Sequence, residues 1–542
     1  MKGLQYCLAL ILLLTVSSCK KDFLQRDTGV PIDIDKLFSD PRLAAGFGDN
    51  SYTFLVSNYG RLNAYRGTTG QFSDEAISNN GEGGVSSINT GQFMLITASD
   101  VVAIYRTMYE GIRNTNVMLE NMDRVPWTTD YNQQYIRGEQ LFLRAFLYFE
   151  LMKRFGGMVL LDKAQTVKES GADLKRSTYQ ETLDFIIRDL DKALSLLPAD
   201  WSAANYGRAT TGAVLALKAR ALLHAASPLH NPSSDAAKWK RAANAAKAVM
   251  DLNRYSLEPN YGDVLTQPSS NEYILMHIKG PIGFSGMMVD FIAPPSYGGL
   301  RNLISVTQNH VDLYEMKNGK PITDISSGYN PQQPYVNRDP RFYHNVIYND
   351  QVWQSRKVET YNGGRDYVAT SPSYTRTSYY VKRLWPEVLK AGSTNTAILN
   401  FLYFRYAEVL LNYAEALNES DGPTTEVYNA VKLVRERAGM PALPSGLNKN
   451  QMRDRIRNER AVEFAFEEMR WWDILRWKKG VELVAQTLNG MSITKSGTNF
   501  TYKVVPLASN FQKVFEDYMH LYPIPRDQML NSPEALVQNP GW

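Results

Sequence analysis

Six histidines are the residues best suited to acid–base or metal chemistry, but their spacing supports neither. None belongs to an H-E-x-x-H pattern or to a close pair of metal ligands. They are His224, His230, His277, His310, His344 and His520. Residues 283–286 read G-F-S-G, which is not the G-x-S-x-G pattern of a nucleophile elbow. These patterns provide neither a metal site nor an activated serine.

Carboxylates are the other candidates for catalysis, because a glycosidase needs only two of them. Asp74 and Glu75 are adjacent in a loop-rich segment. Other carboxylates alternate with arginines on what the sequence predicts to be the last long helix: Glu463, Glu467, Glu468 and Asp473, with Arg460, Arg470 and Arg476. Their spacing of three and four residues favours a structural network of ion pairs. We therefore predict a protein that is not an enzyme and uses no metal ion or cofactor. A surface glycoside hydrolase is kept as an alternative.

The two cysteines lie near the N-terminus, and the second completes a lipoprotein-processing pattern. Residues 8–16 are almost wholly apolar, a run of signal-peptide length and shorter than the ~20 residues of a spanning helix. The sequence V-S-S-C follows and ends at Cys19. We predict that residues 1–18 are a signal peptide and that Cys19 carries the lipid anchor. Because Cys7 lies in the discarded peptide, no cysteine remains for a disulfide or for catalysis.

The composition indicates a globular protein with no affinity for nucleic acid. Hydrophobic residues make up 44% of the chain, which supports a large core. The net charge is only +4, and the basic residues are dispersed. The 32 tyrosines and 9 tryptophans outnumber the 21 phenylalanines. Rings that are both apolar and hydrogen-bonding suit sugar or peptide sites, although they also serve in cores.

Helical periodicity dominates two blocks of the sequence. Residues 138–155, for example, place Phe142, Phe146 and Phe149 on one apolar stripe. We predict helices over 138–155, 179–197, 210–227 and 236–252, and then over 401–418, 424–438 and 451–477. Successive pairs with short links and small residues at the crossings are typical of tetratricopeptide-like helix pairs. A plain helical bundle is the alternative.

The remaining segments are rich in Gly, Pro, Asn, Ser and Tyr, and few helical stripes occur in them. We predict short strands there, over 273–278 and 343–347. The predicted fold is mainly α: a single domain over 19–542 whose helical scaffold covers about 100–255 and 400–542. A loop-rich capping region covers about 40–100 and 255–400. Long loops on a rigid scaffold are common places for binding sites, so we expect this region to face the ligand.

Several segments, in order along the chain, resemble the SusD/RagB-like family of nutrient-binding lipoproteins. The first is G-E-Q-L-F-L-R-A-F-L-Y-F-E-L over 138–151, which continues as R-F-G-G-M-V-L to residue 160. Others are R-A-T at 208–210, A-R-A-L-L at 219–223, N-R-D-P-R-F at 337–342, R-Y-A-E-V-L-L-N-Y-A-E-A-L-N at 405–418, N-E-R-A-V-E-F-A-F-E at 458–467, and the ends Y-P-I-P-R and Q-N-P-G-W at 522–526 and 538–542.

The resemblance implies a lipid-anchored protein on the surface of the bacterial outer membrane, with tetratricopeptide-like helices and no catalytic activity. It also implies capture of an oligosaccharide, or in some members a peptide. The partner would be a TonB-dependent transporter of the SusC/RagA type, over which such proteins act as a lid. The matching motifs are scaffold, and the ligand residues of the family vary, so none carries over to this chain.

Candidate ligand residues therefore come from elimination. The helix stripes are needed for packing, so we expect Trp471, Trp472 and Trp477 to be buried. Trp385 precedes a proline and suits a turn. Aromatic residues in polar, Gly-rich segments are better placed to stack on a ligand, and Asp74 offers a carboxylate beside Phe72. The predicted ligand-binding residues are Asp74, Tyr297, Trp353, Tyr361 and Tyr374.

Overall fold

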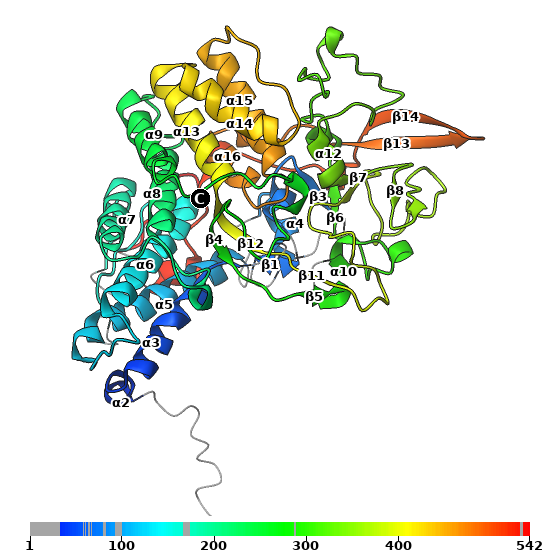
Figure 1. The fold of residues 1–542 in the computed structure, drawn as a ribbon. Helices are drawn as coiled ribbons and strands as arrows, with labels where there is room; N and C mark the ends of the chain where they lie inside the picture. The colour runs from blue at the N-terminus through cyan, green and yellow to red at the C-terminus, as the bar shows by residue number, and fades with distance from the viewer. Residues whose placement is uncertain are drawn as a thin grey trace, which may run out of the picture.

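Helices occupy one half of the molecule, and loops with short strands occupy the other (Figure 1). This computed structural model describes residues 33–542 except 58, 60, 63–64, 67, 80–82, 93–99, 166–173, 287–288 and 532–534. The predicted signal peptide and Cys19 lie outside the described residues. Within them, no helix combines the length and the apolar character that crossing a membrane requires.

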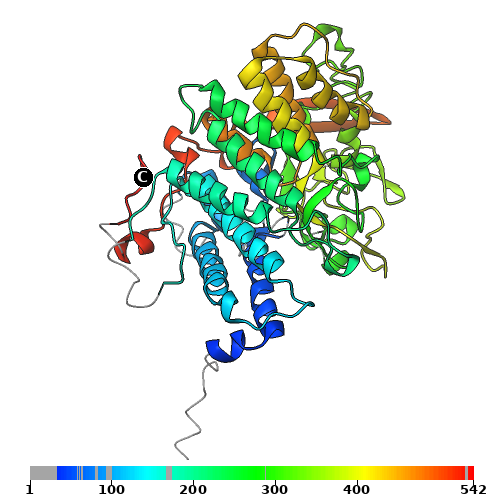
Figure 2. The same ribbon diagram turned by 60° about the vertical axis from the view of Figure 1, so that its left-hand side comes forward.

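The helical half is built from helices that follow one another along the chain and lie side by side (Figure 2). The first group is α5 (Asp100–Asn121), α6 (Gln133–Phe155), α7 (Tyr179–Leu194), α8 (Thr211–Ala226) and α9 (Ala236–Met250). The second is α13 (Tyr406–Asp421), α14 (Thr425–Arg437), α15 (Lys449–Glu463) and α16 (Arg470–Arg476). Because α13 packs on α8 and α9, the two groups form one body. The prediction of a mainly α fold made of helix pairs is confirmed.

Local sequence explains where these helices begin and end. At the start of α7, the Thr178 hydroxyl accepts the N–H of Glu181, and the Glu181 carboxylate accepts the N–H of Thr178. This reciprocal capping box satisfies two N–H groups that a helix start leaves unpaired. Helix α6 ends at Gly156, whose φ of 81° lies in the region that favours glycine. The small side chains of α8 and α9 allow their close approach.

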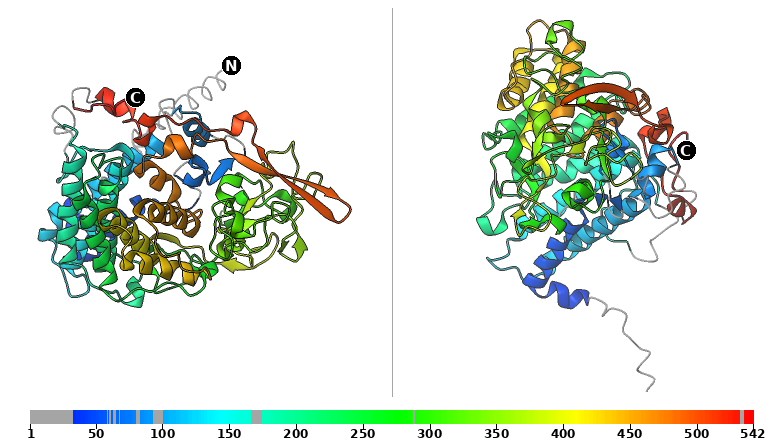
Figure 3. Two further views of the ribbon diagram at one scale, coloured as in Figure 1. Left: turned by 90° about the horizontal axis from the view of Figure 1, so that it is seen from above. Right: turned by 90° about the vertical axis from the view of Figure 1, so that its right-hand side faces the viewer.

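Strands in the loop-rich half pair in antiparallel ladders of two. The longer pairs are β3 (Ala76–Ser78) with β6 (Ile304–Val306), β4 (Tyr273–His277) with β12 (Phe401–Arg405), and β13 (Asn489–Ser496) with β14 (Asn499–Pro506). The β13–β14 hairpin projects away from the body (Figure 3). Ladder β4–β12 packs on α8 and so joins the two halves.

Shorter elements complete the chain. The two-residue strands pair as β1 (Arg61–Leu62) with β2 (Tyr65–Arg66), β5 (Ile282–Gly283) with β11 (Thr396–Ala397), β7 (Val346–Ile347) with β10 (Tyr380–Val381), and β8 (Val352–Trp353) with β9 (Arg356–Lys357). The short helices are α2 (Ile34–Phe38), α3 (Pro41–Asp49), α4 (Gly83–Asn89), α10 (Val289–Ile292), α11 (Gln308–Val311), α12 (Pro340–Asn345), α17 (Gly480–Leu483) and α18 (Arg526–Asn531).

Three predicted elements are wrong in part. The helix expected over 401–418 begins only at 406, because residues 401–405 pair with β4 as strand β12. The single helix expected over 451–477 is two helices, since Phe466 and Glu468 adopt positive φ angles of 61° and 63° between them. The strand expected over 343–347 is mostly the end of α12, followed by two strand residues. Contacts between distant segments override the local pattern in each case.

Each half of the molecule has a large cluster of buried apolar side chains at its centre. The first contains the helix stripes, including Phe142, Phe146 and Phe149, and the buried Trp471 and Trp472. The second lies under the loops and is rich in aromatic residues: Tyr314, Tyr335, Phe342, Trp353, Tyr379, Tyr380 and Trp385. The loop-rich half therefore has a core of its own, although its backbone is largely irregular.

Candidate functional site

The five ligand residues predicted from the sequence lie in different places. Asp74 is 2% exposed, and its two carboxylate oxygens accept hydrogen bonds of 2.9 and 2.8 Å from Nε and Nη2 of Arg470. Burial alone would raise the pKa of Asp74, but the Arg470 guanidinium holds it below its usual value. The carboxylate is therefore fully used inside the protein.

Trp353 and Tyr297 belong to the core beneath the loops. Trp353 is 1% exposed and stands edge-on to Trp385, with ring centroids 5.5 Å apart. Tyr297 is half-buried against the same Trp385 ring and beneath the Arg356 guanidinium, 3.7 Å from its ring centroid. The expectation that Trp353 is exposed is wrong, because polar loop residues around it enclose a second core.

Tyr361 and Tyr374 remain partly exposed. Tyr361 packs against Phe500 of the projecting hairpin, and Lys495 lies 4.7 Å above its ring centroid. Tyr374 has a different neighbour: its carbonyl accepts a 3.1 Å hydrogen bond from Asn79 Nδ2. The five residues thus do not form a single site. The binding role of each stays a prediction.

Asn79 lines an open groove of about 370 Å³ in the loop-rich half. This volume lies at the lower end of the ~300–1,000 Å³ that is usual for small-molecule binding sites. Its walls come from strand β3, helix α4, the loop at 376 and the segment after β14. The described lining residues are Ile77, Ser78, Asn79, Ser86, Asn89, Thr90, Arg376, Asn510, Phe511 and Gln512. Apart from Ile77 and Phe511, these side chains are all polar.

The polar groups of the groove are held in place by the backbone around them. Asn79 Nδ2 donates to the carbonyl of Asn302 at 2.9 Å, and its Oδ1 accepts from Ser305 Oγ at 2.7 Å. Gln512 Nε2 donates to two carbonyls, at Leu488 and Leu507. Because the donors and acceptors of these two amides have partners inside the protein, Asn79 and Gln512 fix the walls of the groove and leave ligand binding to the other lining residues.

Two polar atoms of the groove have no partner. Asn89 Oδ1 and Arg376 Nε are buried, and no hydrogen-bonding group among the described residues reaches them. The Arg376 guanidinium lies 5.9 Å from the centroid of the half-buried Phe511 ring. A buried polar atom without a partner costs ~1–3 kcal/mol, so a water molecule or a ligand that reaches these two atoms in the groove would be stabilised.

A charged cluster beneath the groove fixes two of its walls. Lys513 Nζ donates to the carbonyls of Ser73 and Ala76, at 2.8 Å for the latter, and so ties the 510–513 segment to β3. The carboxylate of Glu75 accepts the N–H of Phe466 at 2.8 Å. Burial lowers the pKa of Lys513 to about 7. Burial also raises the pKa of Glu75 to about 8, and the charges of its acidic neighbours add to the rise.

The helical half contains a second hollow, which differs in character. It measures about 70 Å³ and is lined by apolar side chains and several charged ones. Its arginines have carboxylate partners at 2.6–2.8 Å: Arg154 with Glu150, Arg220 with Glu408, Arg460 with Asp473 and Arg476 with Glu415. Since these charges satisfy each other, this hollow belongs to the scaffold.

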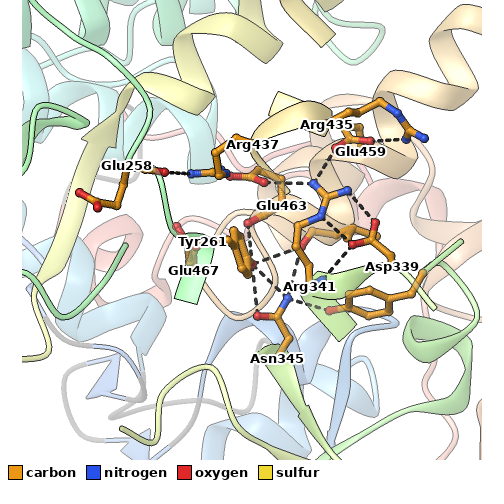
Figure 4. A network of polar contacts seen from close by, with 12 residues as sticks. Glu258, Tyr261, Asp339, Arg341, Asn345, Arg435, Arg437, Glu459, Glu463 and Glu467 are labelled. Carbon is orange, nitrogen blue, oxygen red and sulfur yellow. Dashed lines mark hydrogen bonds and ion pairs between the residues drawn. The ribbon is translucent and has the colours of Figure 1, made fainter. Parts of the chain in front are cut away.

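A buried ion-pair network also uses the carboxylates of the last helices (Figure 4). Arg341 contacts Asp339 at 2.8 Å, Glu459 at 2.6 Å and Glu463 at 3.1 Å. The predicted structural network around Glu463 is confirmed, but its partners come mainly from other elements rather than from neighbouring turns. No group of three His, Cys, Asp or Glu residues in the described part of the chain could hold a metal ion.

No single sequence signal pointed to Asn89, Arg376 or Phe511. Residues 40–100 and 255–400 were expected to face the ligand, and the first two lie within them. Phe511 lies in a segment that was assigned to the scaffold. These side chains are far apart in the chain, and only the packing of β3, α4 and the 510–513 segment brings them together.

Comparisons with known proteins agree on one family. A model of the SusD family matches residues 259–542, and a model described as starch-binding and associating with the outer membrane matches residues 51–223. SusD-like protein P38 of Formosa agariphila is 25% identical over 419 residues, which are 71% of this chain and 73% of that protein.

Solved structures give the same result. A SusD-like protein from Bacteroides fragilis has a TM-score of 0.79 and 26% identity, over 94% of this chain and 98% of its own. A SusD-like carbohydrate-binding protein from the same organism has a TM-score of 0.78 and 22% identity, over 92% of this chain and 100% of its own. The latter likeness shows the fold alone.

Proposed function

Because the chain belongs to the SusD family of carbohydrate-binding proteins, we propose that it captures an oligosaccharide at the cell surface and delivers it to an outer-membrane transporter. The transporter would be a TonB-dependent barrel of the SusC/RagA type. The lipid on Cys19 would hold the protein to the outer membrane. Binding would take place in the groove between β3, α4 and the 510–513 segment.

The composition of the groove is the observation that carries this proposal. A sugar has hydroxyl groups at its edges and weakly apolar C–H faces. The amides of Asn89 and Asn510, the Arg376 guanidinium and the hydroxyls of the groove offer both donors and acceptors, and the half-buried Phe511 offers a ring face. Tyr374 lies beside the groove through its bond to Asn79, so we propose it as a further contact.

A hydrolase is less compatible with the same groove. Glycoside hydrolysis generally uses two carboxylates on opposite sides of the bond. None of the described lining residues is Asp or Glu. Asp74 and Glu75 lie close by, but both carboxylates are turned to internal partners. The groove thus supports binding without catalysis. A peptide is the alternative ligand, since its amides could use the same donors and acceptors.

Titration calorimetry of the purified protein against neutral and acidic oligosaccharides and short peptides tests the proposal. We expect an oligosaccharide to bind and Phe511→Ala to weaken it about tenfold, because a stacked ring contributes ~0.5–1.5 kcal/mol beyond burial. The matched control is Tyr206→Ala, which removes an aromatic side chain, 37% exposed, that lies outside the groove. Peptide binding without sugar binding, equal effects of the two variants, or turnover of the bound sugar would overturn the proposal.

The anchor has its own test. Cys19→Ala should release a folded protein from the membrane fraction during a carbonate wash, because acyl chains supply the membrane affinity. Retention of the variant after the wash would exclude Cys19 as the anchor. Gentle detergent extraction of the wild-type protein should yield it together with a large barrel protein. Recovery of the wild-type monomer alone would argue against delivery to a transporter.

A further inference from the structure

We propose that the groove selects an acidic sugar, one that carries a carboxylate or a sulfate, and that Arg376 is the residue that recognises the acidic group. This inference rests on the proposed function, because it assumes that the groove binds a sugar. It goes further by naming the chemical class of the ligand and the side chain that distinguishes it from a neutral sugar.

The contacts of Arg376 leave one nitrogen of its guanidinium available. Nη1 donates to the carbonyl of Ala369 at 2.5 Å, which fixes the plane of the group. The backbone N–H of Arg376 donates to Ser305 Oγ at 3.1 Å, which fixes the start of the side chain. Neither Nε nor Nη2 meets an acceptor in the described part of the chain. Nε is covered by the protein, so Nη2 is the donor that a carboxylate or sulfate in the groove can reach.

No carboxylate among the described residues balances this charge within the groove. Arg376 forms no ion pair with any described residue, and the described lining residues include no Asp or Glu. The nearby Lys513 is turned away, toward the carbonyls of Ser73 and Ala76. The described lining therefore carries one uncompensated positive charge. The hydroxyls of a neutral sugar could accept hydrogen bonds from this guanidinium but would bring no opposite charge, whereas an acidic sugar would supply both.

Two other arginines of this chain that lie beside aromatic rings have carboxylate partners. Arg220, also half-enclosed by aromatic and apolar side chains, has Glu408 as a bidentate partner at 2.7 and 2.6 Å. Arg356, beneath the loops, has Asp366 at 2.7 Å on two nitrogens. Arg376 is half-buried like Arg356 and also has a ring beside it, Phe511 at 5.9 Å, but no described carboxylate pairs with it. The ligand is the group that would complete the pair.

The hydrogen-bonding groups around Arg376 fit a sugar more closely than a simple anion. Asn89 Oδ1 lacks a donor, and an anion has none to give, whereas a sugar hydroxyl does. Phe511 adds an apolar face that inorganic anions do not use. Because Nε is covered and Nη1 is bonded to the carbonyl of Ala369, the acidic group would accept a hydrogen bond from Nη2.

The test compares three ligands of equal length: an oligouronate, its carboxyl-reduced neutral form, and a sulfated neutral oligosaccharide. Each is titrated into the wild-type protein, Arg376→Gln, Arg376→Lys and Arg365→Gln. Arg365 is the matched control, because it is an exposed arginine of the same loop-rich region outside the groove. Thermal unfolding of each variant verifies that it is folded. The two acidic ligands distinguish a carboxylate from a sulfate as the recognised group.

We expect an acidic ligand to bind at least about tenfold more tightly than the neutral form, with the advantage shrinking as salt screens the charges. Arg376→Gln should remove that advantage and leave the affinity for the neutral form within about twofold, since an amide keeps hydrogen bonds but no charge. Arg376→Lys should retain part of the advantage, because it keeps the charge but loses the planar guanidinium. Arg365→Gln should leave all affinities unchanged.

Several outcomes would overturn the inference. Equal or tighter binding of the neutral form to the wild-type protein would do so, as would equal losses in Arg376→Gln and Arg365→Gln, which would indicate unspecific attraction. If the neutral form binds and depends on Phe511, the acidic preference fails while the proposed function stands. If none of the three ligands binds, and no other oligosaccharide does, both fail.

Discussion

The hollow in the helical half and the groove in the loop-rich half use the same residue types differently. Around the hollow, arginines and carboxylates stand at 2.6–2.8 Å from each other. In the groove, Arg376 and Asn89 have polar atoms that no described residue satisfies. A charge that is paired inside the protein holds the fold together. A charge that is left unpaired at an open groove is available to a ligand. Whether a charged group has a partner inside the protein, rather than its residue type, therefore distinguishes the scaffold from the site.

The largest expected effect comes from breaking the scaffold network in Figure 4. Arg341→Leu leaves Asp339, Glu459 and Glu463 without their central cation. We expect the free energy of unfolding to fall by about 3–5 kcal/mol, because removing one partner leaves buried charges uncompensated. Urea denaturation measures it. The control is Lys357→Ala, which breaks an exposed ion pair with Asp350 and should hardly change stability. Similar small losses in both variants would contradict the comparison.

Asp74 tests whether a residue at the boundary belongs to the scaffold or to the site. Asp74→Ala should cost about 3 kcal/mol or more, since Arg470 would stay buried without its partner. The double variant Asp74→Leu/Arg470→Met removes both charges and should recover most of the stability. If ligand affinity recovers together with stability, Asp74 acts by positioning β3. If stability recovers and affinity does not, Asp74 contacts the ligand directly, as the sequence predicted.

The charged cluster beneath the groove should give the protein a specific pH dependence. With a folded-state pKa of about 8 against a usual value of about 4.5, Glu75 binds a proton in the folded state over a range where the unfolded chain has lost it. Its contribution to stability is complete below pH 4.5 and is lost as the pH rises through 8. We therefore expect wild-type stability to fall, relative to Glu75→Gln, by on the order of 1 kcal/mol or more between pH 5 and pH 8.

Chemical denaturation of both proteins at several pH values measures this difference. The comparison between variant and wild type cancels the titration of groups that Glu75 does not influence, such as His310, whose burial lowers its pKa to about 3. Lys513 does not cancel, because the Glu75 carboxylate raises its pKa, so the measured difference belongs to the two groups together. A difference in stability that is constant across the range would show that Glu75 is already ionised in the folded protein.

The smallest effect is expected at the projecting hairpin. Tyr361→Ala removes a ring that contacts Phe500 and Lys495 at the surface. We expect almost no change in melting temperature, because an exposed cation–ring contact contributes only ~0.5–1 kcal/mol. The loss of affinity should be less than about tenfold, because one stacked ring contributes ~0.5–1.5 kcal/mol. Calorimetry with long and short forms of one oligosaccharide checks this. A loss seen only with the long form would show that the ligand extends from the groove to the hairpin, and no loss with either form would remove Tyr361 from the site.

The sequence determined much of the fold, because helix periodicity is a local property. The stripes over 138–155 and 236–252, and the cap at Thr178, required no tertiary information to be recognised. The absence of the metal-ligand and nucleophile patterns that were sought, and the place of both cysteines before residue 20, followed from the residues alone, as did the resemblance to the family. Burial of Trp471, Trp472 and Trp477 followed from their place on a helix stripe and is confirmed.

Only the tertiary structure decided which loop residues face solvent and which pair inside. Trp353 is surrounded by polar sequence, yet its ring is enclosed by Trp385 and its neighbours. The sequence around Asp74 shows no partner for its carboxylate, yet Arg470, almost 400 positions later in the chain, donates two hydrogen bonds to it. Arg376 and Phe511 meet across 134 intervening residues. In irregular segments no periodicity fixes the direction of a side chain, so its surroundings are set by the packing of distant parts of the chain.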